Sequence, residues 1–289
     1  MRTDTANEDF NIGMIFDLDS YLARLRLPAR VTLDAEGLAR LQRSHRLAIP
    51  FENLDVMLGR PIRIDPEDAF AKLVTRSRGG FCFEHNRVFL DALVMLGFEA
   101  RALLARVWLG ATDTPPLTHT LTLITIGEQA WIADPGFGGS YTPPMPLVDG
   151  AEAPAPDGAR FRLQRDPALG WLLLRHGEAA TTDGRAAETG WVRQYSFTTA
   201  PVWDADLAMG AHWAATAPDT RFTTHHIVSI VLPHGFASLT DRNYRRRAGA
   251  EEASGVIDDP RVYRMRLSLM FGIDLSSEEV RSLPLFAQA

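Results

Sequence analysis

The sequence predicts an α+β fold in which helices come first, strands follow, and the two mix in the last third. Apolar residues recur at helical spacing through the first third. The middle third changes to short segments rich in β-branched residues and separated by turns. Because helices and strands occupy separate stretches, an antiparallel sheet or barrel is favoured over a wound parallel sheet.

The first third predicts a small helical bundle that ends near Gly97. Its first helix has Asp17 as N-cap and stops at Pro28. A later helix begins with Asp65 and Pro66, an N-cap followed by proline at the first helical position. The residues expected to form buried helical stripes are Leu18, Tyr21, Leu22, Leu25, Leu33, Leu38, Leu41, Phe70, Leu73, Val74, Phe89, Ala92, Leu93 and Leu96.

The middle third predicts antiparallel strands, expected at 99–109, 119–126, 130–134, 160–165, 170–176 and 191–199. A two-residue turn at 127–128 would pair Ile126 with Gln129. The last third predicts one strand at 226–232 and a short helix that opens at Ser276 or Ser277.

Length, charge and cysteine content limit the classes of protein to which the chain can belong. The chain has 289 residues, a formal net charge of −6 and a single cysteine. A negative net charge argues against general nucleic-acid binding, and no apolar run is long enough to predict a membrane span. With one cysteine and a polar N-terminal segment that lacks a signal-peptide pattern, we expect a cytoplasmic protein.

Cys82 is the candidate nucleophile. Two glycines, Gly79 and Gly80, precede it and are expected to let the chain bend sharply, and a helical pattern follows it. A thiol at a helix N-terminus can have a lowered pKa, because unpaired N–H groups and the helix dipole favour the thiolate. The alternative is that Cys82 is a small buried apolar residue with no chemistry.

A nucleophilic cysteine needs a base and a group that orients it. The predicted hairpin brings His119 and Asp134 onto one face of the sheet, two positions from a direct pair. His85 is a rival base, three residues beyond Cys82 on the same helix. His225 and His226 have no nearby acidic or cysteine companion, so a metal site is not expected.

Four stretches resemble those of the arylamine N-acetyltransferase family. Residues 49–55 (Ile-Pro-Phe-Glu-Asn-Leu-Asp) and 78–86 (Arg-Gly-Gly-Phe-Cys-Phe-Glu-His-Asn) carry the most specific matches. Thr118-His119 at the start of an apolar strand and the segment 134–138 (Asp-Pro-Gly-Phe-Gly) complete the set. The intervals between Cys82, His119 and Asp134 agree with the family pattern as well.

The resemblance implies a cysteine-proteinase-like core in three units. These are a helical bundle at 1–97, a β-barrel at 98–200 and an α/β lid at 201–289. It implies a Cys82–His119–Asp134 triad in which the cysteine takes an acetyl group as a thioester, His119 holds the thiol proton and Asp134 orients the imidazole. The family uses acetyl-CoA as donor and arylamines or arylhydrazines as acceptors, in a ping-pong order and without a metal.

The resemblance also implies contacts with both substrates. Phe51, Gly136 and Phe137 are expected to contact the acceptor amine. Residues expected to contact CoA are Trp108, Gly110 and Thr118.

Several positions depart from the family pattern. Pro135 stands where valine is common, and His85 stands where glutamine is common. Ala211, Trp213 and Ala217 replace an expected asparagine, tyrosine and serine, which leaves the contacts of that segment open. Arg78 and Glu52 are expected either to brace the cysteine turn or to form an ordinary surface ion pair.

Two other functions stay open from the sequence. A Cys-His-Asp hydrolase or transglutaminase-like enzyme would share the acyl-thioester step and differ in what attacks it. A catalytically inactive binding module would keep the pocket without turnover. Pairing with a second copy of the chain is also left open.

Overall fold

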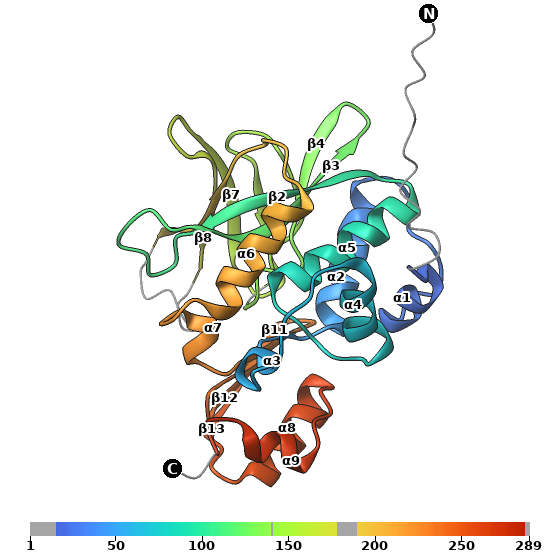
Figure 1. Cartoon of the computed structure of the whole chain (residues 1–289). Coiled ribbons are helices and arrows are strands. Elements are labelled where there is room, and N and C mark those ends of the chain that lie inside the picture. The colour runs from blue at the N-terminus through green and yellow to red at the C-terminus, as the bar shows by residue number, and fades with distance from the viewer. Residues whose placement is uncertain (1–15, 140, 178–189, 287–289) are drawn as a thin grey trace, which may run out of the picture.

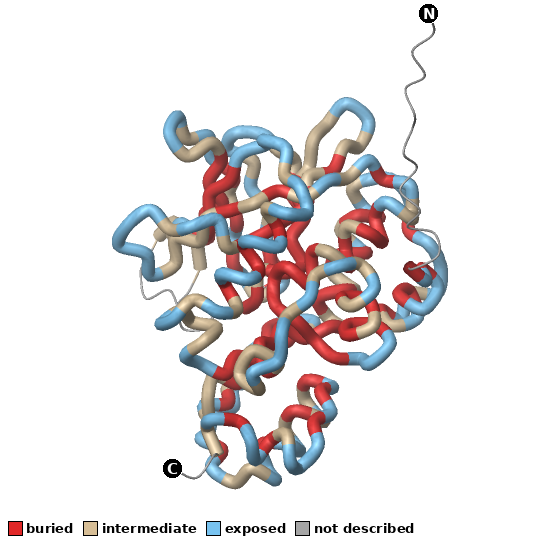
Figure 2. Tube along the Cα trace, in the orientation of Figure 1, coloured by how far each residue is buried: buried red, intermediate tan, exposed pale blue. Residues whose placement is uncertain are grey.

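The computed structural model describes residues 16–139, 141–177 and 190–286. A helical part, a large curled sheet and a smaller sheet with its own helices meet in the middle of the molecule (Figure 1). The chain is most buried where these parts meet (Figure 2). The order of helices, strands and a mixed last third confirms the predicted α+β class.

The described helices are α1 (Leu18–Arg24), α2 (Ala35–Ala48), α3 (Leu54–Met57), α4 (Pro66–Phe70), a π-helical turn (Ala71–Thr75), α5 (Cys82–Leu96), α6 (Asp204–Thr216), α7 (Arg221–Thr224), α8 (Pro260–Phe271) and α9 (Ser277–Ser282). The described strands are β1 (Phe51–Glu52), β2 (Glu99–Val107), β3 (Leu117–Ile126), β4 (Gln129–Ala133), β5 (Met145–Pro146), β6 (Glu152–Pro154), β7 (Arg160–Asp166), β8 (Gly170–His176), β9 (Trp191–Phe197), β10 (Ile227–Leu232), β11 (Gly235–Thr240), β12 (Asn243–Ala248) and β13 (Glu251–Val256).

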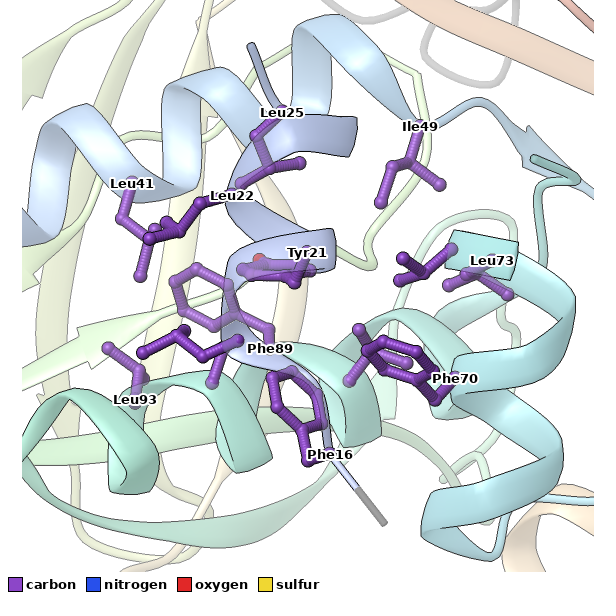
Figure 3. Packing of buried hydrophobic residues seen from close by; sticks show 14 of the residues in the cluster. Phe16, Tyr21, Leu22, Leu25, Leu41, Ile49, Phe70, Leu73, Phe89 and Leu93 are labelled. Carbon is purple, nitrogen blue, oxygen red and sulfur yellow. The ribbon is translucent and has the colours of Figure 1, made fainter. Parts of the chain in front are cut away.

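The N-terminal helices α1 and α4 begin at the residues that the sequence indicates, but α1 ends at Arg24, before the predicted stop at Pro28. Asp17 and Asp65 cap α1 and α4 by accepting backbone N–H groups, and Gly97 ends α5 in the left-handed conformation at φ 103°. Their apolar faces enclose one core, shown in Figure 3. Leu33, expected in a buried stripe, lies before α2 and is 54% exposed.

The large sheet has eight antiparallel strands in the order β5-β4-β3-β2-β9-β8-β7-β6 and curls into a nearly closed barrel. Ile126 pairs with Gln129 across the β3–β4 turn, as predicted. Because a shift of one residue would turn every side chain to the other face, this register decides where His119 and Asp134 lie.

The small sheet has the order β1-β10-β11-β12-β13, and α8 and α9 cover one of its faces. Its first strand, β1, comes from the helical third of the sequence and pairs with β10. This pairing ties residues 51–52 to the last third of the chain, which no local pattern predicted. None of the helices in the described ranges is long and apolar enough to span a bilayer.

Candidate active site

Cys82 is the first residue of α5, and the carboxylate of Glu84 holds the turn before it. Glu84 Oε2 accepts the Phe81 N–H at 3.0 Å, which satisfies one of the free donors at the start of the helix. Lys72 Nζ lies 2.8 Å from Glu84 Oε1. The helix that carries the thiol therefore starts from a position held by a buried ion pair.

Gly79 and Gly80 serve close packing and not a left-handed turn, because neither has a positive φ. A Cβ at Gly79 would collide with the carbonyl oxygen of Pro50, and one at Gly80 would lie 2.6 Å from Glu84 Oε2. The two glycines let the cysteine turn lie directly against the strand segment at Pro50.

A buried cluster of charges braces this turn. Arg78 Nη2 lies 2.7 Å from Glu52 Oε1, and Lys72 Nζ lies 2.8 Å from Asp55 Oδ2. Glu52 is fully buried, so the Arg78–Glu52 pair is not the ordinary surface ion pair that the sequence left open. Burial opposes ionisation of Asp55, but Lys72 and Arg78 outweigh it and lower the pKa of that carboxyl.

His119 and Asp134, the candidate base and orienter, lie in contact as the predicted hairpin register requires. His119 Nε2 lies 2.7 Å from Asp134 Oδ2, and both side chains are buried. Asp134 Oδ1 accepts the Gly136 N–H at 3.0 Å and an Asn86 Nδ2–H at 3.2 Å. Burial alone would raise the pKa of Asp134, but His119 and these donors lower it, so the group is a carboxylate at neutral pH.

The thiol of Cys82 is 3% exposed, and its Sγ lies 3.8 Å from the carbonyl oxygen of Thr118. Burial raises the pKa of the thiol and the charge of Asp134 raises it further, while the N–H groups of Phe83 and Thr120 lower it. The net direction is upward, contrary to the lowering expected from the helix terminus alone. Ionisation of this sulfur thus requires a partner that takes the proton.

A cavity of about 470 Å³ opens over Cys82 and His119. Five of the six residues expected to contact substrates line it: Phe51, Gly110, Thr118, Gly136 and Phe137. Trp108 is not among the residues that line this cavity. Its indole Nε1–H donates to Ser196 Oγ at 2.9 Å instead.

The cavity has further walls that the sequence did not assign. Phe222 packs against Phe51 with ring centroids 5.9 Å apart, and Arg221 and Trp213 complete that side. Trp213 is also part of a second, more open hollow of about 830 Å³ between α6 and the start of β3. In Figure 1, α6 crosses the barrel beside β2.

The three residues that depart from the family pattern in α6 and just after it have different surroundings. Trp213 lines both hollows and Ala217 lines the more open one, whereas Ala211 is buried against the core beside Cys82.

His85 does not line the catalytic cavity, although it is only three residues from Cys82. Its Nε2 lies 3.0 Å from the Pro50 carbonyl oxygen and its Nδ1 lies 2.8 Å from His45 Nε2. His45 Nδ1 lies 2.8 Å from the Tyr21 hydroxyl. Since a carbonyl only accepts, the chain has one consistent direction: Tyr21 donates to His45, His45 to His85, and His85 to Pro50.

Four buried polar side chains support the site and had no assigned role. Gln42 Oε1 accepts the Asp134 N–H at 2.7 Å, and Arg46 donates to the carbonyl oxygens of Pro135 and Gly139. Asn86 contacts Asp134, and the Tyr195 ring packs 5.1 Å from the His119 ring. Gln42 and Arg46 fall on the same helical face as Leu38 and Leu41, and polar residues within an apolar stripe are the signal that could have revealed them.

No cluster of histidine, cysteine and carboxylate side chains suited to a metal occurs in the residues that the structure describes. A cysteine at a helix start, facing a barrel that carries a buried histidine–carboxylate pair, is the arrangement of enzymes that form acyl thioesters. The arrangement of the site therefore indicates the class of acyl-transfer enzymes.

Comparison with known proteins gives the family. The N-acetyltransferase family model matches residues 34–280. An arylamine N-acetyltransferase / N-hydroxyarylamine O-acetyltransferase of Salmonella typhimurium is 35% identical over 264 residues, 90% of this chain and 89% of the relative. The Escherichia coli arylamine N-acetyltransferase is 36% identical over 229 residues, 78% of this chain and 77% of the relative. The chain belongs to the arylamine N-acetyltransferase family.

Solved structures agree with this assignment. The Salmonella typhimurium arylamine N-acetyltransferase superposes with a TM-score of 0.84 at 30% identity, covering 92% of this chain and 97% of that one. A Mycobacterium marinum arylamine N-acetyltransferase in complex with CoA gives 0.82 at 29% identity, covering 93% and 99%. These relatives are named as acyltransferases, which favours transfer over the hydrolase and the inactive module.

Proposed function

We propose that this protein moves an acetyl group from acetyl-CoA to an arylamine or arylhydrazine through a thioester on Cys82. The observation that carries the proposal is the 2.7 Å contact of Asp134 with His119, which lines the same cavity as Cys82. In the same proposal, residues 1–97 supply the nucleophile, residues 98–200 supply the histidine and aspartate, and residues 201–289 cover the cavity.

In the first half-reaction the Cys82 proton moves to His119 and the sulfur attacks the carbonyl carbon of the acetyl group. The bond from that carbon to the CoA sulfur then breaks, and CoA leaves with the proton held by His119. Burial disfavours an isolated thiolate, so the charge forms only together with the imidazolium, which Asp134 stabilises.

In the second half-reaction the acceptor nitrogen attacks the thioester. Its proton passes to His119, the carbon–sulfur bond breaks and the thiol of Cys82 is restored. Phe51 and Phe137, both on the cavity wall, offer aromatic surfaces that suit a flat arylamine. This order gives ping-pong kinetics, since CoA departs before the amine reacts.

Where CoA lies is a proposal of its own. The relative from Mycobacterium marinum was solved with CoA, and the chain offers Gly110 and Thr118 on the rim of the cavity for the donor. Trp108 does not line the cavity, and its indole N–H is bonded to Ser196. We also propose a cytoplasmic protein without nucleic-acid or membrane partners, and a homodimer stays an open prediction.

Mass spectrometry after mixing with acetyl-CoA tests the central step. We expect one added acetyl group on the peptide that contains Cys82, and its loss when an arylamine is added. Turnover of p-nitrophenyl acetate with and without an arylamine separates transfer from hydrolysis. A turnover rate that does not change when the arylamine is added would favour the hydrolase. The absence of any acetyl adduct would favour the inactive binding module.

A further inference from the structure

One buried amide joins the segment before α3 to the last third of the chain. Asn53 is 2% exposed, and its Oδ1 accepts the Ile227 N–H at 2.7 Å. Its Nδ2 donates to the carbonyl oxygens of Phe222 at 2.8 Å and His225 at 2.7 Å. These partners lie 169 to 174 positions further along the chain, at the end of α7 and the start of β10. In Figure 1, α3 and α7 accordingly lie side by side.

The partners of Asn53 fix both the orientation and the identity of its side chain. Because a backbone N–H only donates and a carbonyl only accepts, the amide can lie in one orientation alone. Its oxygen has one donor, and its nitrogen has two acceptors. Aspartate has the same shape, but as a carboxylate it only accepts and would face two carbonyl oxygens. The position therefore requires an asparagine.

Asn53 does not have the role that its place in the sequence predicts. An asparagine just before a helix ordinarily caps that helix with its own side chain. Asn53 precedes α3 without making a cap bond to it within the described chain, and the Leu54 N–H donates to Glu52 Oε2 at 2.8 Å instead. The amide serves α7, whose last carbonyl groups have no partners within the helix. A residue of the nucleophile-bearing third thus caps the end of α7.

The helix that Asn53 caps carries a wall of the catalytic cavity. Phe222 lines this cavity, and its ring centroid lies 5.9 Å from that of Phe51 and 5.8 Å from that of Phe81. The backbone adds to the connection, because the Asn53 N–H donates to the Ile227 carbonyl oxygen at 3.2 Å and continues the pairing of β1 with β10. One short segment therefore carries the Phe51 wall and holds the Phe222 wall.

We infer that Asn53 is a positioning residue that fixes Phe222 relative to Phe51 and so determines how well an aromatic acceptor is held. The inference rests on the proposed acetyl transfer and assigns it a further residue. Asn53 is not among the residues that line the cavity, so it acts through the main chain at Phe222.

Loss of the amide should release α7 without opening the small sheet. Asp241 Oδ1 accepts the His226 N–H at 2.9 Å, and β10 stays paired with β11 along its whole length. These contacts hold the start of β10 independently of Asn53. The expected defect is therefore local to the end of α7.

The test compares an aromatic acceptor with one that has no ring. Asn53→Asp and Asn53→Ala would be assayed with 4-methylaniline and with hydrazine. In a ping-pong reaction, kcat/KM for the acceptor reports the second half-reaction only. We expect this value to fall at least about tenfold for 4-methylaniline in both variants, because a displaced binding wall misplaces the ring. For hydrazine, which has no ring to hold, it should stay at the wild-type value.

Three controls separate positioning from a general loss of structure. Asn243→Asp makes the same change at an exposed position and should keep both values. Leu267→Ala creates a cavity beneath the small sheet, so it should lower the melting temperature yet keep the ratio of the two acceptors. Alkylation of Cys82 by iodoacetamide should proceed at the wild-type rate in N53D and N53A. All assays would run below the melting temperature of every variant.

Four outcomes would overturn the inference. The ratio of the two acceptors could stay unchanged in both Asn53 variants, or both acceptors could lose activity equally. The ratio could fall in L267A as well, which would make it follow stability and not the position of α7. Failure of both N53D and N53A to fold would assign Asn53 a purely structural role. Turnover of 4-methylaniline by the wild type tests the proposed function separately.

Discussion

His45 Nε2 lies 2.8 Å from His85 Nδ1 in the core between α2 and α5. Both rings are buried, and each has a second partner that leaves no site for an extra proton. Burial is the main reason that the pKa of His85 is lowered to about 3 and that the pKa of His45 lies well below its ordinary value.

This pair predicts acid sensitivity of the fold. The unfolded chain binds protons on these histidines below about pH 6.5, whereas the folded chain does not. The free energy of unfolding should therefore be unaffected by them above pH 7. It should fall below pH 6.5 toward pH 3 by about 1.4 kcal/mol per pH unit for each histidine. In His85→Gln, the free energy of unfolding measured with denaturant should fall less steeply with decreasing pH, by about 1.4 kcal/mol per pH unit. The control is His234→Gln, because His234 is exposed. If H85Q and the wild type show the same dependence of stability on pH, His85 is not the source of the acid sensitivity.

His119→Ala should make Cys82 nearly unreactive at neutral pH. Burial and Asp134 raise the pKa of the thiol, and without the imidazole no neighbouring group takes its proton. Alkylation by iodoacetamide as a function of pH would measure this, with an inflection above pH 8.5 expected in the variant. His85→Gln should keep the wild-type profile, because His85 is bonded to Pro50 and His45. A shifted profile in H85Q would instead make His85 the base.

Cys82→Ser should lose about 10³-fold or more in acetyl transfer, because a hydroxyl is not ionised at neutral pH and attacks poorly. The melting temperature should stay near that of the wild type, since serine has almost the same shape. Turnover close to the wild-type rate would show that another group carries the acetyl.

Lys72→Met should destabilise the protein by about 3–5 kcal/mol, because it leaves the buried Glu84 and the partly buried Asp55 with less compensating charge. Arg63→Met removes a pair whose side chains are 69% and 42% exposed and should cost less than about 1 kcal/mol. Chemical denaturation of both variants measures the difference. Equal small losses would mean that the charge cluster does not brace the cysteine turn.

Short-range signals explain what could be predicted. The caps at Asp17, Asp65 and Gly97 and the pairing of Ile126 with Gln129 depend only on neighbouring residues, so the sequence was enough to find them. The same hairpin register brings His119 beside Asp134. The family resemblance added the function, which no local pattern alone would have specified.

Contacts between distant segments explain what was missed. The direction in which His85 points depends on His45, which lies on the distant helix α2. The hydrogen bond from the Asp134 N–H to Gln42 likewise joins the end of β4 to α2. Trp108 lies two residues before Gly110 in sequence, yet its indole reaches Ser196 on β9 and not the cavity. The direction of the thiol pKa likewise follows from burial, which is a property of the packed molecule.

From its residues alone this chain had a class of fold, a candidate nucleophile and a candidate histidine–aspartate pair, because spacing along a helix or a hairpin is a local matter. Packing of the helices, the barrel and the small sheet decided which side chains face the cavity. It also decided how far the thiol of Cys82 is buried and that Ser229 pairs with Phe51. These depend on pairings such as β1 with β10, which join residues nearly 180 positions apart, and no local pattern encodes such contacts.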